Sequence, residues 1–239
     1  MSLTSTFLSL FNIQRSKIKT NQLLMPIFFQ HQISETTRLG IWKIEESEEF
    51  FKGTVPQHRD VTHPHKRLQH LAGRFLLQFL FPGFPYELVR IADTRKPFLP
   101  DEQYHFSISH CGDYAAAIVS KDSRVGIDIE IPVEKILKIK NKFLSEEEKK
   151  IFNAQYSMFN AQGSEFTTHD SRLTTLLWSA KESVFKWYGN GAVDFRRHIK
   201  LTEQNNDLES INCLFSKDKT ELTIHNRQFE HLMLSWVVS

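Results

Sequence analysis

Three short segments with the residue pattern of β-strands follow one another closely, and they constrain the fold more than any other feature of this sequence. The segments are 104–109, 114–120 and 125–131, and only short turns around 110–113 and 121–123 separate them. Short strands joined by turns, with a few helices and no alternation of strand and helix, are typical of antiparallel sheets. A further strand pair is predicted at 221–225 and 230–238. The sequence therefore predicts an α+β fold with mostly antiparallel sheets.

Three helices are also predicted, one before these strands and two between residues 131 and 221. Apolar residues recur at helical spacing over 66–80, and the same pattern covers 172–188, which Gly189 ends. Ser145 and Glu148 form a capping box that opens a third helix. On the first helix, Arg67, His70 and Arg74 line one stripe beside the buried face. A solvated helix edge and an anion-binding site both explain this stripe, and the pattern alone favours neither.

Composition excludes several classes of protein. The chain has 239 residues, of which 40% are hydrophobic and 24% are charged, as in a globular protein with a substantial core. A formal charge of +2 does not indicate nucleic-acid or membrane-surface binding, and no apolar run is long enough to span a membrane. Two cysteines exclude a disulfide framework. We expect a cytoplasmic protein without a targeting segment.

The strand 125–131 carries two acidic side chains on one face. Ile127, Ile129 and Ile131 alternate with Asp128 and Glu130, so the isoleucines share one side of the strand and the acids share the other. If they are partly buried, two adjacent carboxylates need a shared proton or a cation, and oxygen ligands favour Mg²⁺ or Mn²⁺. An acidic strand edge that faces solvent is an equally open interpretation.

The helix 172–188 adds a second charged pair. Glu182 and Lys186 are one helical turn apart, away from a buried side that we expect to include Ala180 and Val184. Taken alone, this spacing is typical of a surface salt bridge.

Together these segments resemble the motifs of the 4′-phosphopantetheinyl transferases of the surfactin-synthetase-activator type. The acidic strand and the helix segment Trp178-Ser179-Ala180-Lys181-Glu182 match the paired signature of that family. Residues 93–97 resemble its Gly-Lys-Pro element and 106–110 its Asn-Ile-Ser-His element, and the helix through Lys66, Arg67 and Arg74 lies where the family has an Arg-bearing helix. Arg95, Ser107 and Cys111 depart from the usual residues. The resemblance covers about residues 66–191.

The family implies two similar α/β halves in a pseudo-twofold arrangement, with residues 1–120 as the N-terminal half and 121–239 as the C-terminal half. It also implies a monomeric enzyme, a holo-acyl-carrier-protein synthase. Such an enzyme transfers phosphopantetheine from coenzyme A to a serine of an apo acyl or peptidyl carrier protein and releases adenosine 3′,5′-bisphosphate. The carrier would serve fatty acid or secondary metabolite biosynthesis.

The resemblance also assigns roles to individual residues. Magnesium, or manganese, would be held by Asp128, Glu130 and Glu182, and the catalytic residues would be Glu182 as general base and Lys186 on the pyrophosphate. The residues implied in coenzyme A binding are Arg67, Arg74, Lys96, Ser109, His110, Lys181 and Lys186.

Two other classes of function stay open at the level of sequence. A metal-dependent phosphodiesterase or nuclease also uses two acids on a strand with a Glu and a Lys, although we expect such an enzyme to be more basic. A non-catalytic binding module would use the same charges as surface pairs. The segment His63-Pro64-His65 lacks the spacing and the cysteine pair of a zinc site.

Overall fold

The computed structural model describes residues 27–55, 61–160, 169–204 and 209–239. Its first sheet has the strand order β1-β2-β6-β5, in which all neighbours are antiparallel. The strands are β1 (Ile27–Gln32), β2 (Thr37–Lys43), β5 (His105–Cys111) and β6 (Tyr114–Ser120). Between β2 and β5 the chain forms α2 (Glu48–Lys52), α3 (Pro64–Leu80), the 3-10 helix η1 (Tyr86–Leu88) and a ribbon of β3 (Arg90–Ile91) and β4 (Pro97–Phe98).

The second sheet has the order β7-β11-β10-β9-β8 and is also antiparallel throughout. Its strands are β7 (Val125–Glu130), β8 (Ile199–Gln204), β9 (Ser210–Phe215), β10 (Thr220–Gln228) and β11 (Met233–Val238). The helices of this part are η2 (Glu134–Ile139), α4 (Lys140–Phe143), α5 (Glu146–Asn160), α6 (His169–Tyr188) and α7 (Phe195–His198). Apart from the β3–β4 ribbon, every described strand up to Ser120 belongs to the first sheet, and every described strand from Val125 onward belongs to the second.

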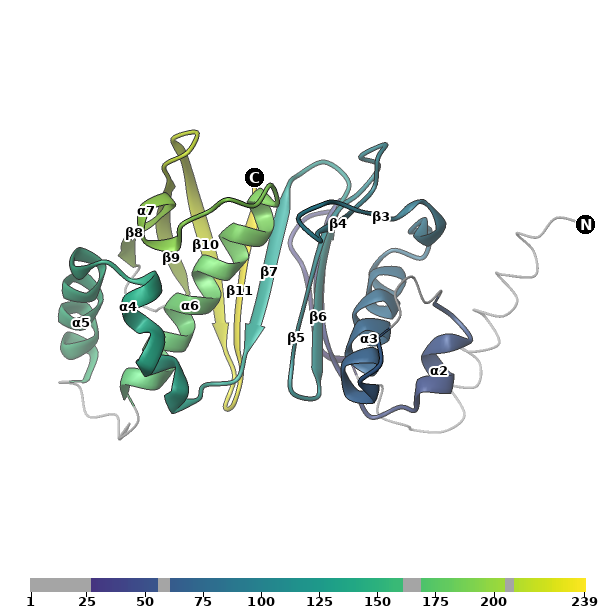
Figure 1. Ribbon diagram of the computed structural model, residues 1–239, viewed down its shortest axis with the longest axis horizontal. Coiled ribbons are helices and arrows are strands. Elements are labelled where there is room, and N and C mark those ends of the chain that lie inside the picture. The colour runs from purple at the N-terminus through teal and green to yellow at the C-terminus, as the bar shows by residue number, and fades with distance from the viewer. Residues whose placement is uncertain (1–26, 56–60, 161–168, 205–208) are drawn as a thin grey trace, which may run out of the picture.

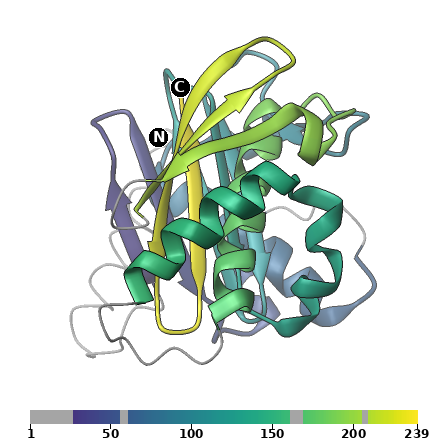
Figure 2. The ribbon, with the colours of Figure 1, turned by 90° about the vertical axis from the view of Figure 1, so that its left-hand side faces the viewer.

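The two sheets face each other at the centre of the molecule, and helices cover their outer sides. Figure 1 shows α3 outside the first sheet and α6 outside the second. Figure 2 looks onto the second helical side, where α4 and α5 lie in front of α6. Apolar side chains of both sheets form the central core, among them Leu39, Ile41, Ile118, Ile127 and Ile129. Two further cores lie under α3 and under α6.

The structure confirms the predicted α+β class, and most predicted elements match observed ones. The capping box is present, since Ser145 Oγ accepts from the Glu148 N–H at 3.2 Å and Glu148 Oε2 accepts from the Ser145 N–H at 2.7 Å. The first long helix begins at Pro64, two residues before the predicted start. Proline is tolerated there because the first turn of a helix needs no N–H donor at that position. None of the described helices is both long and apolar enough to span a membrane.

Candidate active site

Strands β5 and β7 lie side by side where the two sheets meet, and two serine hydroxyls link them. Ser107 Oγ accepts from the Ile127 N–H at 3.2 Å, and Ser109 Oγ accepts from the Ile129 N–H at 3.3 Å. Because β7 is the edge strand of its sheet, these N–H groups have no ladder partner on that side. The two serine side chains of the first sheet therefore accept hydrogen bonds from backbone N–H groups at the edge of the second sheet.

Asp128 lies at the centre of the site and is only 2% exposed. Its Oδ1 accepts from the Lys186 ammonium at 2.6 Å and from the Ser109 hydroxyl at 2.9 Å, while Lys186 Nζ also donates to Ser109 Oγ at 2.8 Å. Asp128 Oδ2 is buried and has no hydrogen-bond partner. The interpretation of this strand as a solvent-facing acidic edge is therefore wrong for Asp128. The interpretation of Lys186 as half of a plain surface pair with Glu182 is also wrong, since Lys186 binds Asp128.

Helix α6 reaches Asp128 because Gly126 lets it approach β7 closely. A Cβ atom at Gly126 would come within 3.0 Å of the Ser183 carbonyl oxygen and of the Trp187 backbone nitrogen. Glycine is the residue that permits such a close approach of two backbones. The predicted buried side of this helix is confirmed, with Ala180 and Val184 fully buried.

Two further carboxyl groups share the electrostatic environment of Asp128. Burial, followed by the charge of Asp128, raises the pKa of Glu130 to about 7, and the Trp178 indole donates to Glu130 Oε1 at 3.2 Å. Burial, Asp128 and Glu130 likewise raise the pKa of Glu182 to about 7, whereas Lys186 opposes this shift. The Cys111 thiol lies beside Glu130, and burial and that carboxyl raise its pKa to about 11.

The chemistry of these groups fits a hard divalent cation. The Asp128 carboxylate is close enough to raise the pKa of both Glu130 and Glu182, and Glu130 also raises the pKa of Glu182. One buried carboxylate oxygen, Asp128 Oδ2, has no partner. In the described part of the chain, however, no group of three or more His, Cys, Asp or Glu side chains is arranged to hold a metal ion. The positive charge that Asp128 contacts is the Lys186 ammonium.

Lys96 lies at the end of α6, close to this site. Its ammonium donates to the carbonyl oxygens of Lys186 at 2.6 Å and Trp187 at 3.4 Å, and burial lowers its pKa to about 8. Thr94 Oγ1 donates to the carbonyl oxygen of Gly189 at 3.0 Å, so two residues of the β3–β4 region bind the last turn of the helix. The role of Lys96 at the helix end was not expected from the sequence.

A cavity of about 290 Å³ opens beside Lys96, and both halves of the chain line it. Lys96 and Phe98 belong to the lining from the first half, and Arg124 and Tyr188 to that from the second. The lining residues are Ala92, Lys96, Pro97, Phe98, Leu99, Glu102, Tyr104, His105, Phe106, Arg124, Val125, Tyr188, Gly189 and Asn190.

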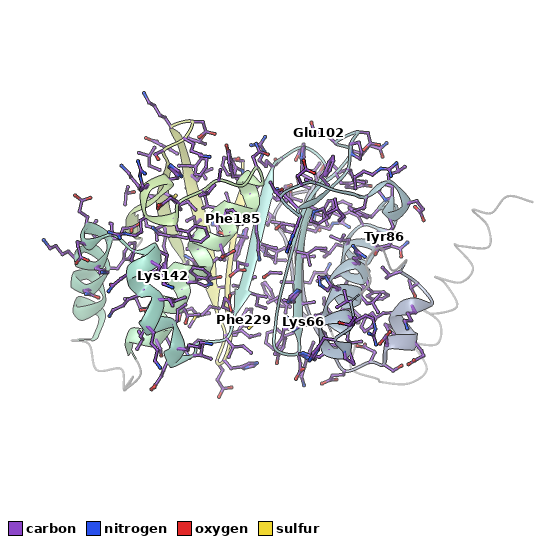
Figure 3. All side chains as sticks on the ribbon, viewed as in Figure 1. Lys66, Tyr86, Glu102, Lys142, Phe185 and Phe229 are labelled. Carbon is purple, nitrogen blue, oxygen red and sulfur yellow. The ribbon has the colours of Figure 1, made fainter. Side chains whose placement is uncertain are left out.

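Two of the other residues that the resemblance assigns to coenzyme A have different surroundings. His110 is exposed, and it lies close enough to Lys186 and Asp128 for their charges to act on its pKa. Its ring lies edge-on to that of His70, with the centroids 5.3 Å apart. Arg67, on α3, binds the Glu48 carboxylate at 2.7 Å and the Val61 carbonyl oxygen at 2.8 Å. Figure 3 labels its neighbour Lys66, which is exposed on the same helix.

Lys181 requires a correction. Its side chain is fully buried, and the ammonium binds Glu148 at 2.6 Å and the carbonyl oxygens of Phe195 at 2.9 Å and Ile199 at 2.7 Å. These three acceptors use all three hydrogens of the ammonium. Lys181 therefore joins α6 to α5 and β8 beside the hydrophobic core under α6. Its ammonium has no hydrogen left to donate to coenzyme A. Neighbouring positions on a helix point in different directions, which separates Lys181 from Glu182.

Sequence reasoning also missed the role of Ser107. A signal was present, because Phe106 and Ile108 alternate with Ser107 and Ser109 along β5. The two apolar residues pack into the core with α3, whereas the two serines bind β7.

Comparison with known proteins points to the same family that the sequence motifs resemble. Residues 124–237 match the family model described as the 4′-phosphopantetheinyl transferase superfamily. The curated relatives include the enterobactin synthase component D of Salmonella austin, which is 32% identical over 125 residues, or 52% of this chain and 49% of the relative. The protein of the same name from Escherichia coli K12 is 42% identical over 66 residues, or 27% of this chain and 31% of that protein.

The chain spans about half the length of the Salmonella relative that it matches. The matched residues include β7 with Asp128 and Glu130, and α6 with Glu182 and Lys186. The three central acids and the lysine that contacts Asp128 therefore all fall inside the family match. Residues 124–237, just under half of this chain, are thus the part that is similar to the 4′-phosphopantetheinyl transferase superfamily.

Proposed function

We propose that this protein transfers the 4′-phosphopantetheine group of coenzyme A to a serine of an apo carrier protein. The observation that carries the proposal is the cluster of Asp128, Glu130, Glu182 and Lys186, which lies where the two sheets meet and inside the family match. In the reaction, the serine oxygen attacks the β-phosphorus of coenzyme A. The bond from that phosphorus to the bridging oxygen breaks, and adenosine 3′,5′-bisphosphate leaves.

Glu182 is the proposed general base. The nucleophilic serine must lose its proton as it attacks, and a base is most effective when its pKa lies near the working pH. Burial and the neighbouring acids bring the pKa of Glu182 to about 7. In this role Glu182 takes the serine proton, and the protonated carboxyl group later releases it to solvent.

Asp128, Glu130 and Glu182 are the residues that we propose to hold Mg²⁺ or Mn²⁺. When bound, the cation would neutralise charge on the pyrophosphate oxygens, which is the main need in phosphoryl transfer. The unpartnered Oδ2 of Asp128 and the raised pKa values of the two glutamates support this assignment.

Lys186 and residues of the first half are proposed to bind coenzyme A. Lys186 lies against Asp128 and can place its positive charge on the pyrophosphate. His110 and Lys96 lie near it, and the cavity beside Lys96 has the aromatic and cationic lining that suits the nucleotide end of coenzyme A. Arg67 and Arg74 stay proposed contacts of the 3′-phosphate, for which Arg67 would have to share its guanidinium with Glu48.

The carrier protein is the proposed macromolecular partner, and exposed lysines mark a surface for it. Lys135, Lys138 and Lys142 lie on η2 and α4, directly after β7, and are exposed. Figure 3 labels Lys142 on the outer side of the second half. The name of the relatives, enterobactin synthase component D, favours a carrier of secondary metabolism over one of fatty acid synthesis. A cytoplasmic location and a monomeric state stay predictions.

The test is a transfer assay read by mass spectrometry. Incubating the protein with coenzyme A, Mg²⁺ and apo peptidyl and acyl carrier proteins is expected to add one phosphopantetheine group. Glu182→Gln and Asp128→Asn are expected to lower the rate about 100-fold or more while the protein stays folded. Glu146→Gln, at an exposed glutamate on α5, is the control and is expected to keep the wild-type rate. Absence of both transfer and coenzyme A binding in the wild type would refute the proposal.

A further inference from the structure

We propose that Ser109 is a positioning residue, which acts by holding the Asp128 carboxylate and the Lys186 ammonium in place rather than by touching coenzyme A. This inference rests on the proposed function and assigns to Ser109 a role different from the coenzyme A contact that the family resemblance implies. Its basis is the set of hydrogen bonds made by the Ser109 hydroxyl group. The residue is buried, with an exposed fraction of 6%.

The hydrogen-bonding capacity of Ser109 is fully used inside the protein. A serine hydroxyl has one proton to donate and two lone pairs to accept with. Here the proton goes to Asp128 Oδ1 at 2.9 Å, and the lone pairs accept from Lys186 Nζ at 2.8 Å and from the Ile129 N–H at 3.3 Å. A phosphate oxygen needs a donor, and the only donor of this side chain is committed to Asp128.

These bonds determine how the carboxylate is oriented. Asp128 Oδ1 accepts both the Ser109 hydroxyl and the Lys186 ammonium, so the partnered oxygen is turned toward β5. Oδ2, buried and without a partner, is the oxygen left for another positive group. An unpaired buried oxygen costs free energy, and it persists only where its surroundings hold it in place. Ser109, on the other sheet, supplies part of that restraint.

Ser107 provides a matched control on the same strand. It is 5% exposed, and its hydroxyl accepts from the Ile127 N–H at 3.2 Å, as Ser109 accepts from the Ile129 N–H. Ser109 alone of the two also contacts Asp128 and Lys186. Comparing Ser107→Ala with Ser109→Ala therefore separates loss of a link between the sheets from loss of the contact with the carboxylate.

The experiment combines transfer kinetics with calorimetric binding of coenzyme A in Mg²⁺ and in EDTA. Ser109→Ala is expected to lower kcat about 10-fold, as for a hydrogen bond to a charged group, with the coenzyme A affinity in EDTA unchanged. It is also expected to lose most of the extra affinity that Mg²⁺ provides. Ser107→Ala is expected to keep both kcat and that extra affinity, and Ser109→Thr, which retains the hydroxyl, to restore kcat.

Each other outcome contradicts the inference. Equal losses of kcat in the two alanine variants would reduce Ser109 to a link between the sheets, and weaker coenzyme A binding in EDTA as well as in Mg²⁺ would make it a direct contact. If Ser109→Ala does not fold, Ser109→Cys carries the same comparison, since a thiol of similar size is only a weak donor. If the wild type transfers nothing, the proposed function itself fails. The wild-type reaction thus separates that failure from the failure of Ser109 alone.

Discussion

At the scale of single residues, the site depends on buried charge that is only partly neutralised. Asp128 has one positive partner, Lys186, while Glu130 and Glu182 lie near it without an ion pair among the described residues. Burying like charges together raises the free energy of the folded state, and such groups are concentrated at functional sites. Lys181 shows the opposite case, since its buried charge is fully matched by Glu148 and two carbonyl oxygens.

This uneven neutralisation predicts how stability depends on pH in the metal-free protein. The pKa of Glu182 is raised from 4.5 to about 7 in the folded state, so its contribution to stability is full below pH 4.5 and is lost as the pH rises through about 7. In EDTA, we expect the free energy of unfolding, measured by urea denaturation, to fall between pH 5 and 8. Glu182→Gln should reduce that fall by on the order of 1 to 2 kcal/mol, allowing for partial exposure.

The control for this prediction is Glu146→Gln. Glu146 is exposed, and its pKa is lowered by the Lys149 ammonium rather than raised, so it does not titrate between pH 5 and 8. The control should therefore follow the wild-type curve. An unchanged pH dependence in Glu182→Gln would show that this carboxyl group is ionised throughout the range.

At the scale of elements, the position of α6 over β7 brings the lysine to the acid. Lys186 belongs to the helix and Asp128 to the strand, so their contact depends on how closely the two elements pack. Lys96 and Thr94 bind the carbonyl groups at the end of α6, which satisfies acceptors that a helix end leaves unpaired. Gly126 thus allows α6 to pack directly against β7, and Lys96 and Thr94 bind the C-terminal end of the helix.

The close approach at Gly126 predicts that even the smallest side chain there is harmful. In Gly126→Ala the added Cβ would come within 3.0 Å of the backbone of Ser183 and Trp187, so α6 must move away from β7. We expect a loss of about 1 to 3 kcal/mol or more in the free energy of unfolding, measured in urea, and a lower kcat because Lys186 moves with the helix. Gly53→Ala is the control, since the nearest atom there lies 3.7 Å away. Equal stabilities of the two variants would contradict the packing argument.

At the scale of the whole molecule, the site exists only because the two sheets meet. Ser109 comes from the first sheet, Asp128 and Lys186 come from the second part of the chain, and residues of both line the cavity beside Lys96. The small net charge of +2 conceals this arrangement, because acids gather where the sheets meet while Lys135, Lys138 and Lys142 are exposed on η2 and α4. A sum of charges is uninformative where opposite charges are segregated.

The exposed lysines predict how a carrier protein is recognised. Replacing Lys135, Lys138 and Lys142 together with glutamate should raise the carrier KM about 10-fold or more and leave coenzyme A affinity unchanged, because these charges attract an acidic partner over a distance. The carrier KM of the wild type should rise with salt, and that of the variant should not. Lys43→Glu, at the exposed end of β2 in the first sheet, is the control, because its ammonium pairs with the exposed Glu45 carboxylate. A carrier KM that changes equally in both would place the docking surface elsewhere.

The sequence by itself determined the class of fold, the approximate boundaries of the strands and helices that it predicted, and the alternation that places Asp128 and Glu130 on one face of β7. These follow from local periodicity, because alternation along a strand and spacing along a helix are set by backbone geometry. The tertiary structure alone decided that Lys186 binds Asp128 rather than Glu182, that Lys181 turns into a core, and that Ser107 and Ser109 join the two sheets. Each of these contacts links segments far apart in the chain, and their approach depends on packing that no local pattern encodes.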